Sequence, residues 1–102
     1  MSKKYIETAF GMSLPRKLMV GAVPYLVEEA KLEADFGDCD TDKKLIRIDL
    51  RRHLTVQQLL VTWHHETGHA IACEYGVRLA ERDTDRMAQG RTQVLKDWME
   101  AQ

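Results

Sequence analysis

The stretch WHHETGHAIACEYG, from Trp63 to Gly76, decides how the rest of the chain is interpreted. It holds three of the four histidines, and two of them, His65 and His69, enclose Glu66 in the order H-E-x-x-H. Residues four apart on a helix lie one above the other, so the two imidazoles can bind one metal ion. The alternative is a helix whose histidines are only solvated. The residues on both sides of the motif bear on this choice.

The motif lies in the second half of a helix whose two ends are marked in the sequence. Thr55 and Gln58 form a T-x-x-Q capping box, which is typical of a helix start. Gly76 is a typical C-terminal stop. The helix is therefore expected over residues 56–75. Its apolar stripe is expected to consist of Val56, Leu59, Leu60, Trp63 and Ala70.

The helical spacing also separates the roles of the residues in the motif. With His65 taken as zero, His69 lies at about 40° around the helix and Glu66 at about 100°, while the apolar stripe is centred on the far side. Glu66 therefore stands beside the metal, where it can accept a proton from an activated water. His64 points about 100° away from His65 and is left out of the site.

A second helix, expected over about residues 80–101, supplies the third protein ligand that zinc needs. Glu81 opens this helix after the short linker GVRL, whereas Glu74 is rotated off the histidine face. Glu81 is the predicted third ligand, and Asp85, one turn further on, is predicted to orient a ligand histidine. The same side continues through Ala88 and Thr92 and is expected to face the first helix. The apolar stripe of the second helix is expected to consist of Met87, Val94, Leu95, Trp98 and Met99, with Trp63 and Trp98 as core aromatics.

The remaining segments predict an α+β fold, a minimal zincin-like domain with a small antiparallel sheet, the active-site helix and a C-terminal helix. Residues 1–15 are expected to form a loosely held arm with a short helix over Tyr5–Phe10, and residues 16–102 the domain itself. Strands are expected over 17–22, 25–32 and 44–50, with a turn over 35–43. In the last strand, Arg47 and Asp49 are expected to form a solvated edge.

Length and composition favour a single globular domain in the cytoplasm. The chain has 102 residues, 44% of them hydrophobic and 30% charged, with a net charge of −1. This balance gives no reason to expect a nucleic acid or a membrane as partner. Cys39 and Cys73 are expected to be free thiols, Cys73 buried in its helix, and neither a signal peptide nor a membrane span is recognisable.

A calcium loop is the main rival interpretation of the acidic turn. Aspartates occupy EF-hand-like positions at Asp38, Asp40, Asp42 and Asp49. However, the sixth position is Lys43 where an EF-hand requires glycine, and strands are expected on both sides. An acidic hairpin turn is therefore preferred.

Several segments resemble the ImmA/IrrE family of gluzincin metallopeptidases, in particular its short phage- and prophage-encoded members. The matching segments are HETGHAI (65–71), ERDTDRMAQGRTQVLKDW (81–98), the strand KLIRI and the turn FGDCDTDK, and together they cover about residues 16–98. The resemblance implies zinc ligands at His65, His69 and Glu81, and a general base at Glu66. The chain departs from the family at Asp83 and Thr84, where many relatives have Glu-Ala, and at Thr67, which is usually aliphatic.

These observations predict a zinc metallopeptidase that cleaves a protein segment bound along the 44–50 strand, and the resemblance to phage-encoded members implies a phage or host regulatory protein as the target. The candidates for stabilising an oxyanion are His53, His64 and Tyr75. The alternative is a zinc-containing binding or regulatory module without hydrolytic activity, and a third interpretation is a purely structural helix pair.

Overall fold

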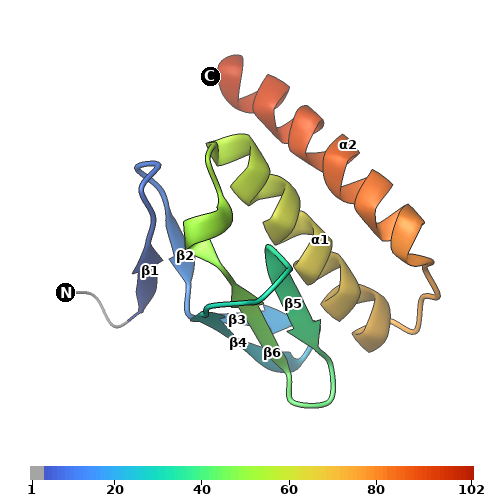
Figure 1. Ribbon diagram of the computed structural model, residues 1–102. Coiled ribbons are helices and arrows are strands. Elements are labelled where there is room, and N and C mark those ends of the chain that lie inside the picture. The colour runs from blue at the N-terminus through green and yellow to red at the C-terminus, as the bar shows by residue number, and fades with distance from the viewer. Residues whose placement is uncertain (1–3) are drawn as a thin grey trace.

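The computed structural model describes residues 4–102 as a sheet, a helix and a second helix stacked in three layers (Figure 1). Helix α1 lies between the main sheet and helix α2, and the two helices run antiparallel. No helix in the described part of the chain is long and apolar enough to cross a membrane. The elements are β1 (Tyr5–Glu7), β2 (Ser13–Pro15), β3 (Lys17–Val20), β4 (Val23–Glu29), β5 (Gly37–Asp40), β6 (Leu45–Ile48), a 3-10 turn (Leu50–Arg52), α1 (Val56–Glu74) and α2 (Glu81–Glu100).

The main sheet has four strands in the order β3-β4-β6-β5. The outer pairs, β3 with β4 and β5 with β6, are antiparallel. The central pair of β4 and β6 is parallel, with Leu26 opposite Leu45 and Glu29 opposite Ile48. The predicted α+β class is confirmed, and the parallel pair is an addition to the expected antiparallel arrangement. Because β6 is central, β3 and β5 are the edges of this sheet.

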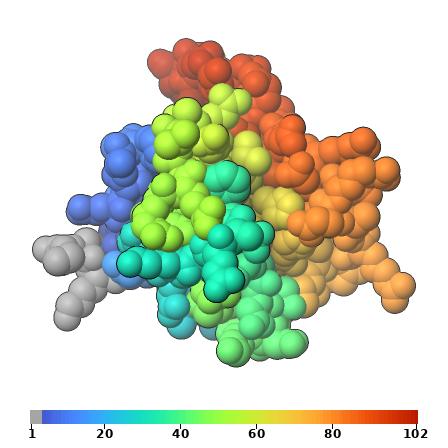
Figure 2. All heavy atoms as spheres, in the orientation of Figure 1, coloured from blue at the N-terminus to red at the C-terminus, as the bar shows by residue number. Residues whose placement is uncertain are grey.

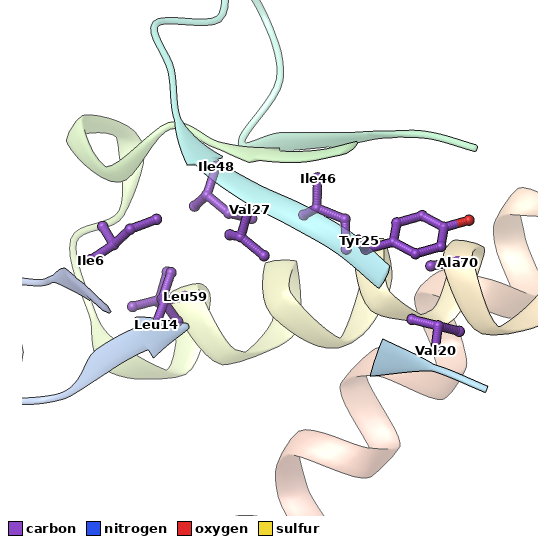
Figure 3. Close-up of a cluster of buried hydrophobic side chains, with 9 residues drawn as sticks. All are labelled: Ile6, Leu14, Val20, Tyr25, Val27, Ile46, Ile48, Leu59 and Ala70. Carbon is purple, nitrogen blue, oxygen red and sulfur yellow. The ribbon is translucent and has the colours of Figure 1, made fainter. Parts of the chain in front are cut away.

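The core lies between one face of the sheet and α1 (Figure 3). Tyr25 and Val27 alternate with exposed neighbours along β4, as expected for a strand with one buried face. Ile46 and Ile48 alternate with half-buried neighbours along β6, which confirms the predicted half-buried strand. The buried hydrophobic cluster comprises Ile6, Leu14, Val20, Tyr25, Val27, Ile46, Ile48, Leu59 and Ala70.

The short helix predicted over Tyr5–Phe10 is wrong, because β1 pairs with β2 as a hairpin. Ile6 stands opposite Leu14, and both side chains are buried in the core. Gly11, with φ of 75°, provides the left-handed conformation of the turn. Residues 5–15 are therefore packed onto the domain, and residues 1–3 of the predicted arm lie outside the described residues.

The turn predicted over 35–43 contains a strand, β5. The strand is not recognisable in the sequence because aspartates are typical of turns. Asp38 on β5 is held by the Arg47 guanidinium of β6, and Asp40 accepts hydrogen bonds from the backbone of the following turn. Asp49 is fully buried and bound to Arg51 and Arg52, so its predicted place on a solvated edge is wrong, whereas the Arg47 side chain is 43% exposed. Donors of the chain itself thus occupy these carboxylates, which favours the acidic turn over a calcium loop.

Both predicted helices form, with ends close to those expected. At the start of α1 both halves of the capping box between Thr55 and Gln58 are present, and Gly76 ends the helix with φ of 69°. Ala88 and Thr92 of α2 are buried, as expected for the side facing α1.

The predicted apolar stripe of α2 does not form part of the core. Trp98 is 62% exposed, so its assignment as a core aromatic is wrong, and Met87 and Val94 are exposed beside it. The large side chains of α2 point away from α1 because only small side chains fit where the two helices cross. Cys73 is also exposed, contrary to expectation.

Candidate metal centre

Two histidines from α1 and one carboxylate from α2 converge at one end of the helix pair. The Nε2 atoms of His65 and His69 lie 3.1 Å apart. One oxygen of Glu81 is 2.6 Å from Nε2 of His65, and the other is 3.0 Å from Nε2 of His69. The three residues predicted as zinc ligands are thus brought together, and their role as ligands stays a prediction.

This donor set fits a zinc ion in chemistry and in size. Two imidazole nitrogens and a carboxylate form a ligand set found in catalytic zinc sites. In a tetrahedral site with bonds of about 2.0–2.1 Å, ligand atoms are about 3.3 Å apart. The observed separations of 2.6, 3.0 and 3.1 Å are shorter than this by about 0.7, 0.3 and 0.2 Å. Small rotamer adjustments would therefore suffice to admit the ion.

Glu66 lies beside the two histidines and with them forms a group that could hold a metal ion, so its assignment as a base rather than a ligand stays a prediction. One of its carboxylate oxygens lies within 4.8 Å of ring nitrogens of His65 and His69. The side chain is only 7% exposed, and no hydrogen-bond partner for its carboxylate is found among residues 4–102. Burial raises the pKa of Glu66 to about 7, against the opposing charge of His65 and with help from Glu81, Asp38 and Asp35. Such a carboxyl can exchange a proton near neutral pH.

The two acids of α2 differ in how closely they approach the histidines. Glu81 is 71% exposed. Partial burial raises its pKa, but the hydrogen bond from His65 and the charges of both histidines outweigh this, and the pKa is lowered. Oδ1 of Asp85 lies 3.6 Å from Nδ1 of His65, beyond hydrogen-bond distance, and its Oδ2 accepts from Gln89. A slight closure would let Asp85 orient His65 as predicted.

The approach of α2 depends on small residues at the helix crossing. A Cβ added to Gly68 of α1 would lie 3.5 Å from Cγ2 of Thr84, which is already van der Waals contact. Thr84 and Ala88 are buried at this crossing. The Thr84 hydroxyl donates to the Ala80 carbonyl, so its hydrogen bond is made within α2. This packing holds the first turn of α2, and with it Glu81, against the histidines.

A groove of about 790 Å³ opens beside the candidate metal centre, between the N-terminal half of α1, the first half of α2 and the loop before β5. Figure 2 shows it as a hollow in which the yellow atoms of α1 lie recessed between the teal segment around β5 and the orange atoms of α2. The lining residues include Asp35, Phe36, Gly37, Thr62, Glu66 and Asp85.

The strand predicted to bind a substrate, 44–50, cannot do so. Its central part, β6, is paired on both sides, with β4 and with β5. The sheet edge that reaches the groove is β5, which begins at the lining residue Gly37. The free edge was missed because the aspartates and glycine of this segment are typical of a turn.

None of the three candidates for stabilising an oxyanion lines this groove. His53 is buried, which lowers its pKa, and both ring nitrogens are engaged, one by the Asp49 carbonyl and one by the Thr62 hydroxyl. His64 faces the opposite side of α1 with Nε2 buried and unpaired. Tyr75 lies beyond the end of α1, beside Gly21.

Asp35, Phe36 and Gly37 are groove residues that sequence reasoning missed. They precede the start of α1 by 19 to 21 positions and belong to no motif, so only the folding of the sheet brings them to the histidines. Comparison of the chain with models of protein families, with curated proteins and with solved structures finds no match.

Proposed function

We propose that this chain is a zinc-dependent metallopeptidase that hydrolyses a peptide bond of a protein substrate. The observation that supports it most is the convergence of His65, His69 and Glu81 beside a buried Glu66 that has no hydrogen-bond partner in the described structure. A merely solvated helix gives no reason to bury most of a glutamate side chain beside two histidines, since removing a carboxylate from water costs free energy.

Each residue has a distinct task in the proposed reaction. His65, His69 and Glu81 would hold Zn²⁺, which when bound supplies Lewis-acid polarisation of a carbonyl and acidifies water. The Glu66 carboxylate would take the proton from the attacking water and pass it to the nitrogen of the leaving amine. The substrate would lie extended in the groove along the free edge of β5, where backbone groups can pair with it.

The substrate and location follow from weaker observations. The resemblance to phage-encoded family members points to a regulatory protein of the phage or its host. Both cysteines are free thiols, which suits a reducing cytoplasm. We therefore place the proposed activity in the cytoplasm, on a protein substrate.

A non-catalytic zinc-binding or regulatory module is the second candidate. It is favoured by one observation, namely that His53, His64 and Tyr75 all lie outside the groove. Without a donor for the developing oxyanion, hydrolysis would lose a factor of about 10²–10³ in rate.

Metal analysis combined with the variant Glu66→Gln tests the proposal. Purified wild-type protein should contain about one zinc per chain, and His65→Ala should lose it. Glu66→Gln should keep the zinc, because Glu66 is not one of the ligands, but should abolish cleavage of a quenched fluorescent peptide library.

The outcomes separate the candidates. Absence of zinc from the wild type would contradict both zinc-based functions. Zinc without cleavage, or cleavage that survives Glu66→Gln, would contradict the peptidase and leave the binding module.

A further inference from the structure

The charged side chains that line the groove are all acidic apart from the histidine of the metal centre. They are Asp35, Glu66, Glu81 and Asp85, and no lysine or arginine is among the described lining residues. This is notable in a chain that has 15 basic and 16 acidic residues. A bound Zn²⁺ would balance two of the four carboxylates, those of Glu66 and Glu81. The charges of Asp35 and Asp85 then remain.

Asp35 is the freer of these two carboxylates. Asp85 accepts a hydrogen bond from Gln89 and lies close to His65. Asp35 has neither a hydrogen bond nor an ion pair with any residue between 4 and 102, and it is exposed at the rim of the groove. Its charge is therefore available to a group that enters the groove from solution.

The loop that carries Asp35 is fixed on both sides. Before it, the Arg52 guanidinium donates hydrogen bonds to the carbonyls of Leu32 and Glu33. After it, the carbonyl of Phe36 accepts a hydrogen bond of 2.9 Å from the backbone of Asp49. The position of Asp35 relative to α1 is thus set by the fold, as recognition of a side chain requires.

The groove also presents a largely buried carboxyl group that has no hydrogen-bond partner in the described part of the chain. Glu66 lines it with its carboxylate unpaired, although the side chain is more than nine-tenths buried. Buried polar groups are normally hydrogen-bonded. Among the described residues only Nε2 of His64 is a fully enclosed side-chain atom without a partner, so the carboxylate oxygens of Glu66 are open to the groove and can accept a hydrogen bond from a molecule bound there.

We propose that the groove selects a peptide with a lysine or arginine close to the bond at Glu66, and that Asp35 is the specificity-determining residue. This inference rests on the proposed function, because the peptidase reaction defines which bond of the peptide lies at Glu66. The cationic side chain reaches the rim while the peptide backbone lies along β5, so its charge meets Asp35 without being buried.

Peptide binding to zinc-loaded Glu66→Gln protein tests this inference without relying on catalysis. Two fluorescein-labelled decapeptides of alternating alanine and leucine, one with a central lysine and one with a central glutamate, serve as probes in fluorescence anisotropy. The lysine peptide should bind about threefold or more tightly than the glutamate peptide, the size of one exposed charge interaction. Raising the salt from about 50 mM to about 500 mM should reduce this ratio.

The additional substitution Asp35→Asn should bring the ratio close to one. Asp42→Asn is the matched control, because Asp42 is an exposed acid in the β5–β6 turn, outside the groove, and its removal should leave the ratio unchanged. Equal binding of the two peptides, or a ratio insensitive to Asp35→Asn, would overturn the proposal. A clear lysine preference in the binding test, together with a wild type that cleaves no peptide, would refute the peptidase and leave the charge selection intact.

Discussion

Glu66 is confined by the backbone of β5 rather than by hydrogen bonds. Gly37, the first residue of β5, faces α1 at the level of Thr62 and Glu66. The absence of a side chain at Gly37 lets the strand close on the helix and cover the Cγ of Glu66. A residue outside every motif thereby shapes the surroundings of the proposed general base.

Replacing Gly37 by alanine should therefore destabilise the protein. The added Cβ would lie 2.9 Å from Cγ2 of Thr62 and 3.0 Å from the backbone oxygen of Arg47, which cannot move aside easily. The expected loss is about 1–3 kcal/mol in the free energy of unfolding, as for other overpacked sites. Urea denaturation measures it. Gly90→Ala is the control, since an added Cβ there meets no atom within 4 Å and should stabilise α2 by about 0.5–1 kcal/mol.

Asp49 should govern stability in acid. It is fully buried and accepts hydrogen bonds from the side chain of Arg51 and from the backbone of Leu32, which hold its pKa far below the usual range. Because the folded-state pKa is lowered, the ionised group stabilises the fold above its unfolded value of about 3.9, and this contribution is lost as the pH falls.

Thermal unfolding at several pH values tests the role of Asp49. The wild type should lose stability progressively between about pH 5 and pH 2. Asp49→Asn should melt at a lower temperature at pH 7 and depend less on pH over that range. Identical pH profiles for the two proteins would contradict the assignment.

At the scale of elements, the packing of α2 on α1 decides whether the site exists. Helix α2 packs mainly against α1, and its buried positions are the small residues Thr84, Ala88 and Thr92. Their counterpart on α1 is Gly68, one position before the second histidine of the motif. The same glycine that belongs to the motif thus admits the helix that carries Glu81.

Gly68→Val should weaken zinc binding while Gly68→Ala should not. A single Cβ fits at 3.5 Å from Thr84, but two further methyl groups would push α2 outward and carry Glu81 away from the histidines. We expect zinc affinity to fall at least about tenfold for valine, the effect of disturbing the support of a metal ligand. Competition with a chromogenic chelator measures the affinity, and equal values for valine and alanine would refute this account.

At the scale of the whole molecule, the proposed zinc ion would add a link between α1 and α2 to the packing that already joins these two helices. His65 and His69 belong to α1, and Glu81 belongs to the exposed start of α2. A ligand that binds only the folded state stabilises it in proportion to the logarithm of its concentration. Metal binding should therefore be visible in the stability of the entire domain.

Zinc should raise the melting temperature of chelator-treated protein. At about 100 times the dissociation constant, the gain is about 2.7 kcal/mol, or roughly 10–20 °C for a domain of this size. Excess EDTA should reverse the shift, and His65→Ala should show none. A shift that persists in His65→Ala would place the metal elsewhere.

The sequence by itself determined the local features of this protein. Helix α1 begins at a capping box and ends at Gly76, and both signals depend on residues within a few positions of each other. The spacing of His65 and His69 places them on one helical face for the same reason. Glu81 could be selected as the third predicted ligand because the linker to α2 is short.

Only the tertiary structure decided the surroundings of the site. Periodicity shows which residues of α2 share a face, but not which face meets α1, so Trp98 was expected inside and lies outside. The pairing of β5 with β6 overrides the turn-like composition of its residues and makes β5 the sheet edge. Asp35 and Gly37 reach the groove by this pairing, because packing between distant segments leaves no periodic trace in sequence.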